Sequence, residues 1–197
     1  EIILLEKPDV IQFQEVNLQM EKNIKSLKSI FPYSVGLNKP IEFFDSVILS
    51  KHPITDSEFL NNNIILVKLT IDEKELTILG VHLINTLTPS RFSIAVQVMD
   101  YLRILINNIN HNLILIGDLN MTPVSKRFEN FLKETDLFTH ISNRNPTFTW
   151  PTFLPFYFGI EIDHVLFSKN FKMIRKKTID HLDFGSDHRP LIVDLVF

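Results

Sequence analysis

The residues Leu113-Ile114-Leu115-Ile116 form an unbroken apolar run that ends at Gly117. A short run with no polar position is typical of a β-strand that is buried on both faces. Such a strand needs a layer of structure on each side, so it predicts an α/β architecture in which helices cover a sheet. The carboxyl ends of strands in open α/β folds are also where functional side chains gather. The residues directly after Ile116 are therefore the first candidates for a functional site.

Apolar spacing along the rest of the chain alternates between helical and extended patterns. Helices are expected at 2–7, 18–31, 90–109 and 125–135, the third of them capped by Ser90. Strands are expected at 10–14, 46–49, 64–71, 76–82, 113–116, 165–168, 171–178 and 191–197. The strands 64–71 and 76–82 form a hairpin through Asp72-Glu73-Lys74-Glu75, which makes the sheet mixed. The pattern predicts a mixed α/β (α+β) fold with two packed sheets and helices outside, in a single domain over residues 1–197.

Composition excludes several classes of protein. The chain has 197 residues, a formal net charge of −3 and 45% hydrophobic residues, which is typical of a globular domain without a global basic field. The absence of cysteine rules out disulfides, thiol catalysis and Cys-based zinc sites. No apolar stretch reaches the length of a membrane span and no signal peptide is present, which leaves the localisation open.

Asp118 and Asn120 follow the buried run directly, in Gly117-Asp118-Leu119-Asn120. Residues two apart in an extended segment point the same way. A carboxylate can take a proton from water, while a neutral amide can donate to a phosphate oxygen without repelling it. The alternative is an ordinary turn, because Gly, Asp and Asn all favour turns.

A second phrase, Ser186-Asp187-His188-Arg189-Pro190, leads into the last expected strand. A histidine beside a phosphate oxygen needs a carboxylate that fixes its tautomer and keeps it protonated. Asp163 is the candidate partner of His188, because an unpaired charge among its apolar neighbours would be costly. We therefore expect a hydrogen bond between Asp163 and the ring of His188.

Three further residues lie at the ends of expected elements. Glu15 follows the strand 10–14, and its hard carboxylate suits Mg²⁺. His82 ends the hairpin strand and is either a packed imidazole or a phosphate donor. Arg91 begins the long helix, where a guanidinium and the helix N–H groups can face an anion, although most such arginines are simply solvated.

In this order the motifs resemble the endonuclease/exonuclease/phosphatase superfamily, which has the deoxyribonuclease-like fold. The matching residues are Gln14-Glu15, His82, Gly117-Asp118-Leu119-Asn120, Ile162-Asp163-His164 and Ser186-Asp187-His188-Arg189-Pro190. The resemblance implies a four-layer sandwich of two mixed β-sheets flanked by helices. It also implies hydrolysis of phosphodiester or phosphomonoester bonds with Mg²⁺ (or Mn²⁺) as cofactor, by in-line attack of an activated water.

The resemblance further implies a role for each matched residue. Glu15 and Asp187 are metal ligands. Asp118 orients or deprotonates the attacking water, and Asn120 holds the phosphate. His188, paired with Asp163, and His82 stabilise the pentavalent transition state. His164 and Arg91 join Asn120 as expected substrate contacts.

Thr149-Trp150-Pro151 ahead of Ile162-Asp163-His164 resembles a bacterial branch that includes YafD-like and VanJ-like proteins. Members of that branch often carry membrane helices before the catalytic domain, which implies a membrane-anchored or extracytoplasmic location through an upstream segment. The family also has a first strand that ends in an asparagine near the metal, and this strand would precede Glu1. Either the chain begins partway into its domain, or a sheet has lost a central strand and the metal site one group near the ion.

The substrate is left open between nucleic acid and a phospholipid or small phosphate ester. The aromatic segment Phe148–Phe158 is either a loop packed on the core or an exposed lip for a lipid tail, a membrane surface or a stacked base. The basic residues Lys172, Arg175, Lys176 and Lys177 are either a solvated strand face or a track for a phosphate backbone. The competing function is a catalytically inactive binding module that retains the fold. We expect a monomer.

Overall fold

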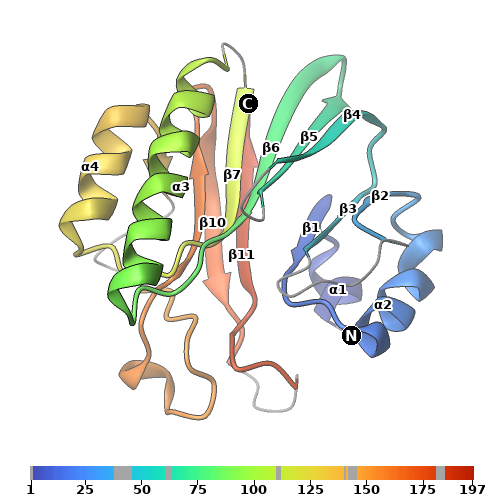
Figure 1. Cartoon of the computed structure of the whole chain (residues 1–197). Coiled ribbons are helices and arrows are strands. Elements are labelled where there is room, and N and C mark those ends of the chain that lie inside the picture. Colours follow the sequence, from blue (N-terminus) through green and yellow to red (C-terminus); the bar gives the residue numbers. More distant parts are fainter. Residues whose placement is uncertain are drawn as a thin grey trace. The chain divides into compact units, whose positions relative to one another are not determined.

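The computed structural model describes residues 2–37, 46–60, 64–109, 112–139, 141, 146–180 and 185–197. The chain divides into two compact units, Glu1–His82 and Leu83–Phe197. Helices pack against sheets in both units (Figure 1), so the predicted mixed α/β class is confirmed. Within the described ranges, no helix combines the length and the apolar character needed to cross a membrane.

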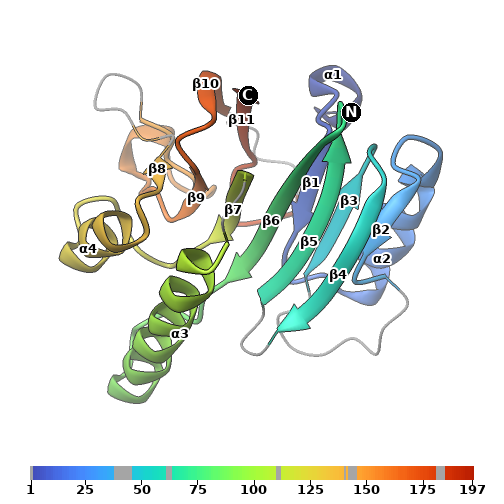
Figure 2. The same cartoon turned by 90° about the horizontal axis from the view of Figure 1, so that it is seen from above.

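The first unit contains two antiparallel sheets. Its elements are α1 (Ile2–Glu6), β1 (Val10–Phe13), α2 (Leu18–Lys25), the 3₁₀ helix η1 (Ser26–Ser29), β2 (Tyr33–Val35), β3 (Val47–Ser50), β4 (Ile54–Leu60), β5 (Ile64–Ile71) and β6 (Lys74–His82). One sheet has the strand order β1-β3-β2 and the other contains the run β4-β5-β6. Figure 2 shows α2 beside the sheet that contains β2 and β3.

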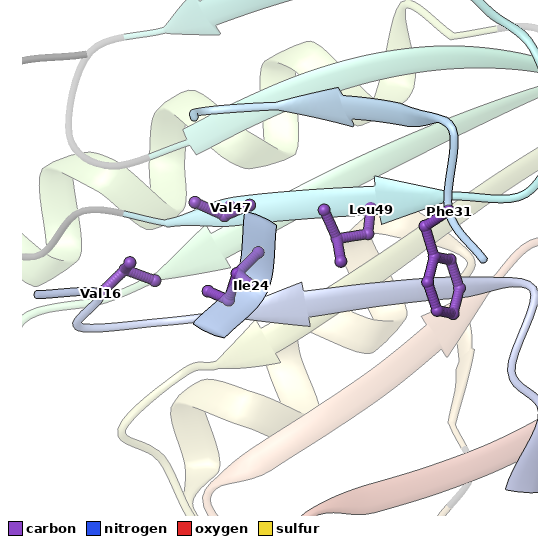
Figure 3. Packing of buried hydrophobic residues seen from close by; sticks show 5 residues of the cluster. All are labelled: Val16, Ile24, Phe31, Val47 and Leu49. Carbon is purple, nitrogen blue, oxygen red and sulfur yellow. The ribbon is translucent and has the colours of Figure 1, made fainter. Parts of the chain in front are cut away.

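An apolar cluster fixes the end of β1, where Glu15 follows. Ile24 of α2 lies over Val47 and Leu49 of β3, with Val16 and Phe31 completing the cluster (Figure 3). Val47 and Leu49 share one face of β3 because side chains alternate along a strand. Since Val16 is buried in this cluster, the residue immediately before it is held in a defined position.

The second unit carries the Asp-Asn and Asp-His motifs. Its elements are α3 (Pro89–Asn107), β7 (Asn112–Asp118), α4 (Lys126–Thr135), β8 (Phe138–Thr139), the 3₁₀ helix η2 (Phe156–Phe158), β9 (Asp163–Phe167), β10 (Lys172–Thr178) and β11 (Leu191–Val196). Strands β7, β9 and β8 pair in that order, and β10 pairs with β11, all antiparallel. Helices α3 and α4 lie next to each other in both views (Figure 1 and Figure 2).

Several boundaries differ from the sequence-based prediction. The expected helix 18–31 ends at Lys25 and continues as the 3₁₀ helix η1. Helix α3 begins at Pro89, because the side chain of Thr88, and not that of Ser90, caps it by accepting from Arg91 N. The hairpin turn is shorter than expected: Asp72 and Glu73 have φ of 47° and 63° and connect β5 to β6 alone, in the manner of a type I′ turn.

Three strands were not predicted. Strand β4 has the sequence ITDSEFL and is exposed at its five central positions, so it lacks the apolar alternation that marks a half-buried strand. Strands β2 and β8 have three and two residues and are too short to show a pattern. Pairing with a neighbouring strand defines all three of them, and a single sequence does not reveal such pairing.

Candidate active site

Strands β7 and β9 bring two of the predicted carboxylates opposite each other. The strands pair antiparallel, with Asp118 at the end of β7 facing Asp163 at the start of β9. Leu113 and Leu115 are buried and hold β7 in the core. Asp118 is itself buried, so its charge has to be stabilised by hydrogen-bond donors of the protein.

Asn120 supplies these donors. Its backbone N–H donates to Asp118 Oδ1 at 2.7 Å, and its Nδ2 donates to Asp118 Oδ2 at 2.9 Å and to Leu83 O at 2.8 Å. Both Nδ2 contacts are oxygen acceptors, which fixes the orientation of the amide. The φ of 48° at Asn120 is a left-handed conformation that asparagine tolerates well. Asn120 therefore orients Asp118, and both hydrogens of its amide are already in use.

The predicted hydrogen bond between His188 and Asp163 is present. Nδ1 of His188 donates to Asp163 Oδ2 at 2.8 Å. Burial of the ring lowers the pKa of His188, but the hydrogen bond to Asp163 and the charge of that carboxylate raise it. Asp118 and Asp187 add further negative charge, and the pKa rises to about 9. His188 is therefore a cation at neutral pH, with its Nδ1 proton engaged and its Nε2 proton available to another group.

The turn that carries Asp187 and His188 is tied to Trp150 and Thr152. Trp150 Nε1 donates to Asp187 Oδ2 at 3.0 Å, and Thr152 N donates to Asp187 O at 2.9 Å. Thr152 Oγ1 donates to Ser186 O at 2.9 Å. We did not predict these contacts, because Thr149-Trp150-Pro151 pointed only to a branch of the family. An indole N–H is a donor only, so a carboxylate is a natural partner and could have been sought.

In the first unit, Glu15 and His82 lie close together. Glu15 Oε1 is 3.7 Å from His82 Nε2, and the glutamate side chain is 68% exposed. Gln14 Nε2 donates to Val81 O at 2.6 Å and ties the end of β1 to the end of β6. Glu15 has a φ of 52°, a left-handed conformation that is unfavourable for glutamate and that often marks functional positions.

Two predicted substrate contacts have other roles in the structure. His164 is buried, where its ring lies 4.5 Å from that of Phe128 (centroid to centroid) and its Nε2 is 2.7 Å from Met121 O. It supports the segment after Asn120, and its contact with substrate stays a prediction. Arg91 donates to Asn85 Oδ1 at 2.9 Å on the surface. Neither residue is part of the site proposed below.

The four basic residues of β10, which are Lys172, Arg175, Lys176 and Lys177, do not form a continuous charged face. Lys176 is buried, and burial lowers its pKa although the charge of Glu161 opposes this effect. Arg175 Nε is 2.6 Å from Asp194 Oδ2, so its charge is paired. These features do not resemble the open basic track that a nucleic-acid backbone requires.

The Asp, Glu and His side chains include possible ligands of a metal ion. Among the residues that the structure describes, no group of three or more His, Asp or Glu side chains is arranged to hold an ion. The predicted ligands Glu15 and Asp187 nevertheless offer only carboxylate oxygens, and the sequence has no cysteine. Such donors fit Mg²⁺ or Mn²⁺, which retain several waters and need few protein ligands. The prediction that all seven site residues line one pocket stays a prediction.

A comparison with known protein families finds a match over most of this chain. The model described as "Endonuclease/Exonuclease/phosphatase family" matches residues 1–188. No curated protein sequence matches the chain. The YafD-like and VanJ-like branch stays a prediction.

Solved structures similar to this chain come from several organisms. An endonuclease/exonuclease/phosphatase family protein from Leptotrichia buccalis is 16% identical with a TM-score of 0.77, and the match covers 100% of this chain and 90% of that one. A mannosyl-6-phosphatase of Bacteroides thetaiotaomicron is 17% identical with a TM-score of 0.72, over 100% and 88%. TDP2 of D. rerio, complexed with a single-strand DNA product, is 16% identical with a TM-score of 0.76, over 100% and 89%. At these identities the likeness shows the fold, and it confirms the predicted sandwich of sheets flanked by helices.

Proposed function

This chain belongs to the endonuclease/exonuclease/phosphatase family, and from that premise we propose that it is a divalent-metal-dependent phosphoesterase. Members of the family are hydrolases that act on phosphoesters. The observation that carries the proposal is a cationic His188, held by Asp163, in the same unit as the buried Asp118. This arrangement offers a base and an acid of opposite charge, as phosphoester hydrolysis requires.

Asp118 and His188 perform the proton chemistry in the proposed reaction. Asp118 accepts a proton from the attacking water as the new O–P bond forms. The bond to the leaving oxygen breaks, and this oxygen takes up a proton from solvent water. His188 donates through Nε2 to a phosphoryl oxygen, where negative charge accumulates. Asp163 orients the ring of His188 through the hydrogen bond to Nδ1.

The contacts of Asn120 support a positioning role for this residue. Its amide donates both hydrogens, one to Asp118 Oδ2 and one to Leu83 O, so direct donation to the phosphate would break one of these bonds. We therefore place Asn120 as the residue that aims the carboxylate of Asp118 at the water. This differs from the role that the sequence resemblance implied.

Glu15 and Asp187 would hold the divalent ion. When bound, the ion supplies positive charge to the phosphate oxygens. His82, which is buried beside Glu15, would stabilise the phosphate in the transition state. The left-handed backbone at Glu15 fits this role, because strained positions persist where function requires them.

The test is turnover of a generic phosphodiester and a generic phosphomonoester, bis(p-nitrophenyl) phosphate and p-nitrophenyl phosphate, with Mg²⁺, Mn²⁺ or EDTA. His188→Gln and Asp118→Asn should each lower kcat by about 100-fold or more. His52→Gln is the matched control, because His52 lies near Asp9 in the other unit. Equal loss in His52→Gln and His188→Gln would contradict the assignment of His188.

The substrate class can then be sorted with plasmid DNA, phosphoinositides, sphingomyelin and prenyl pyrophosphates. The competing function, an inactive binding module, predicts that no substrate is turned over with any metal. It is not favoured, because Asp118, Asn120 and His188 are all present and each is held by hydrogen bonds.

A further inference from the structure

Residues 146–160 form a loop without a single charged side chain, and it exposes large apolar groups. Phe153, Tyr157 and Phe158 are 71%, 82% and 73% exposed. We call the exposed apolar side chains of this loop, Phe153, Leu154, Tyr157, Phe158 and Ile160, the apolar lip. Exposed apolar groups this close together are uncommon on monomeric proteins and mark surfaces that contact something else.

Arg189 holds the loop that carries the apolar lip. The residue is 2% exposed, and its guanidinium donates to Pro151 O and Leu154 O at 2.8 Å each. Its Nε donates to Asp180 Oδ1 at 2.7 Å, and its guanidinium lies 5.6 Å from the ring centre of Phe156. Burying a guanidinium is costly without such contacts. The exposed rings are therefore presented by a braced loop and are not the side chains of a loose segment.

The contacts of Arg189 and Thr152 also connect the apolar lip to the proposed active site. Arg189 directly follows His188, and Thr152 bonds to the backbone of Ser186 and Asp187. Phe153, the first member of the lip, directly follows Thr152 in the sequence. A surface bound by the lip would thus lie next to the groups that handle the phosphate.

The chemistry of the lip favours a lipid surface over a nucleic acid. A nucleic-acid contact brings phosphates and requires Lys or Arg among the aromatic residues, and residues 146–160 contain neither. Uncharged aromatic groups are suited to the boundary between headgroups and acyl chains.

We propose that the apolar lip inserts into the interface of a lipid bilayer and docks the protein on membranes through apolar contacts. The proposal adds a binding surface to the proposed function and does not depend on catalysis. If both hold, the phosphoester that the site receives is one presented at a lipid surface.

The test is cosedimentation with phosphatidylcholine vesicles. The wild-type chain should bind, and binding should persist in high salt because it is apolar. The triple variant Phe153→Ser/Tyr157→Ser/Phe158→Ser should lose about 1,000-fold in partition, since each of the three buried rings contributes roughly a factor of ten. The matched control is Leu87→Ser/Ile174→Ser, which removes exposed apolar groups elsewhere in the same unit and should bind as the wild type does.

A second readout reports insertion directly. Phe158→Trp should show a blue-shifted emission with vesicles, over the background of Trp150, and quenching by brominated acyl chains. Circular dichroism of the triple variant establishes that it is folded, and hydrolysis of bis(p-nitrophenyl) phosphate by the same variant reports on the site separately. Persistent hydrolysis with lost vesicle binding supports the lip proposal and the proposed function together.

Three results would overturn the proposal. The first is absence of binding to phosphatidylcholine, or binding that requires anionic lipid and disappears in salt. The second is a wild-type dimer that becomes monomeric in the triple variant and does not bind vesicles, which would assign the lip to a second copy. The third is tight binding of single-stranded DNA that the triple variant loses while vesicle binding is absent.

Discussion

Replacing Asp163 by Asn removes the charge that holds a proton on His188 and leaves the shape of the side chain nearly unchanged. The pKa of His188 lies about 2.5 pH units above its ordinary 6.5, at about 9. At about 1.36 kcal/mol per unit this is about 3 kcal/mol of preference for the charged ring. Burial acts in the opposite direction and the charges of Asp118 and Asp187 remain, so the loss of the partner should lower the pKa of His188 from about 9 toward its ordinary value.

The pKa can be followed by NMR titration of labelled histidine side chains, in parallel with kcat against pH. If the cation of His188 is needed, wild-type activity falls only as pH rises through about 9, and in Asp163→Asn it falls near neutral pH. The metal concentration for half-maximal activity should stay nearly the same, because Asp163 is not a proposed ligand.

The free energy of unfolding should also depend on the protonation of His188. Because the folded-state pKa of His188 is raised, its contribution is fully present below about pH 6.5 and is lost as pH rises to about 9. The free energy of unfolding should therefore fall by up to about 3 kcal/mol over this window in the wild type and by much less in Asp163→Asn. Asp194→Asn, which removes an exposed carboxylate paired with Arg175, is the control of equal charge. An unchanged pKa of His188 in Asp163→Asn would refute the reasoning.

Three further results are expected. EDTA should abolish hydrolysis, Mg²⁺ or Mn²⁺ should restore it, and Glu15→Gln should show none with either ion; full activity in excess EDTA would rule out the metal mechanism. Glu15→Asn should also be inactive, yet its free energy of unfolding in urea should rise by about 1 kcal/mol, because asparagine tolerates the left-handed backbone. Lys7→Asn, at a φ of 49°, should gain as much stability without losing activity. Arg189→Met should cost about 3 kcal/mol or more by leaving Pro151 O and Leu154 O unsatisfied, and a Tm within one degree of the wild type would show that the brace is dispensable.

The sequence predicted those features of the site that follow from a buried segment and the polar residues next to it. The apolar run 113–116 predicted β7, and the polar phrase after it placed Asp118 and Asn120 at the strand end. The partner of His188 could be predicted, because a carboxylate among apolar neighbours needs a counter-charge. These inferences use only the periodicity of a strand and the cost of an isolated charge.

The rest depends on contacts between distant segments. Arg189 and His164 would ordinarily be assigned to the surface or the site, yet both are buried because other segments supply carbonyl acceptors for them. The role of Asn120 likewise follows from Leu83 O, which lies 37 residues away in sequence. Residue type alone indicates which bonds a side chain can make, and the fold decides which of them are made.

Arg189 holds the loop 146–160 through two backbone carbonyl groups. Arg189 binds the carbonyl oxygens of Pro151 and Leu154, and these acceptors are present whatever side chains follow them. The residues that point outward can therefore be exchanged without touching the bonds that set the position of the loop. Grafting a different outer surface onto this segment, polar or basic, should redirect the protein to another kind of substrate while His188 keeps its place.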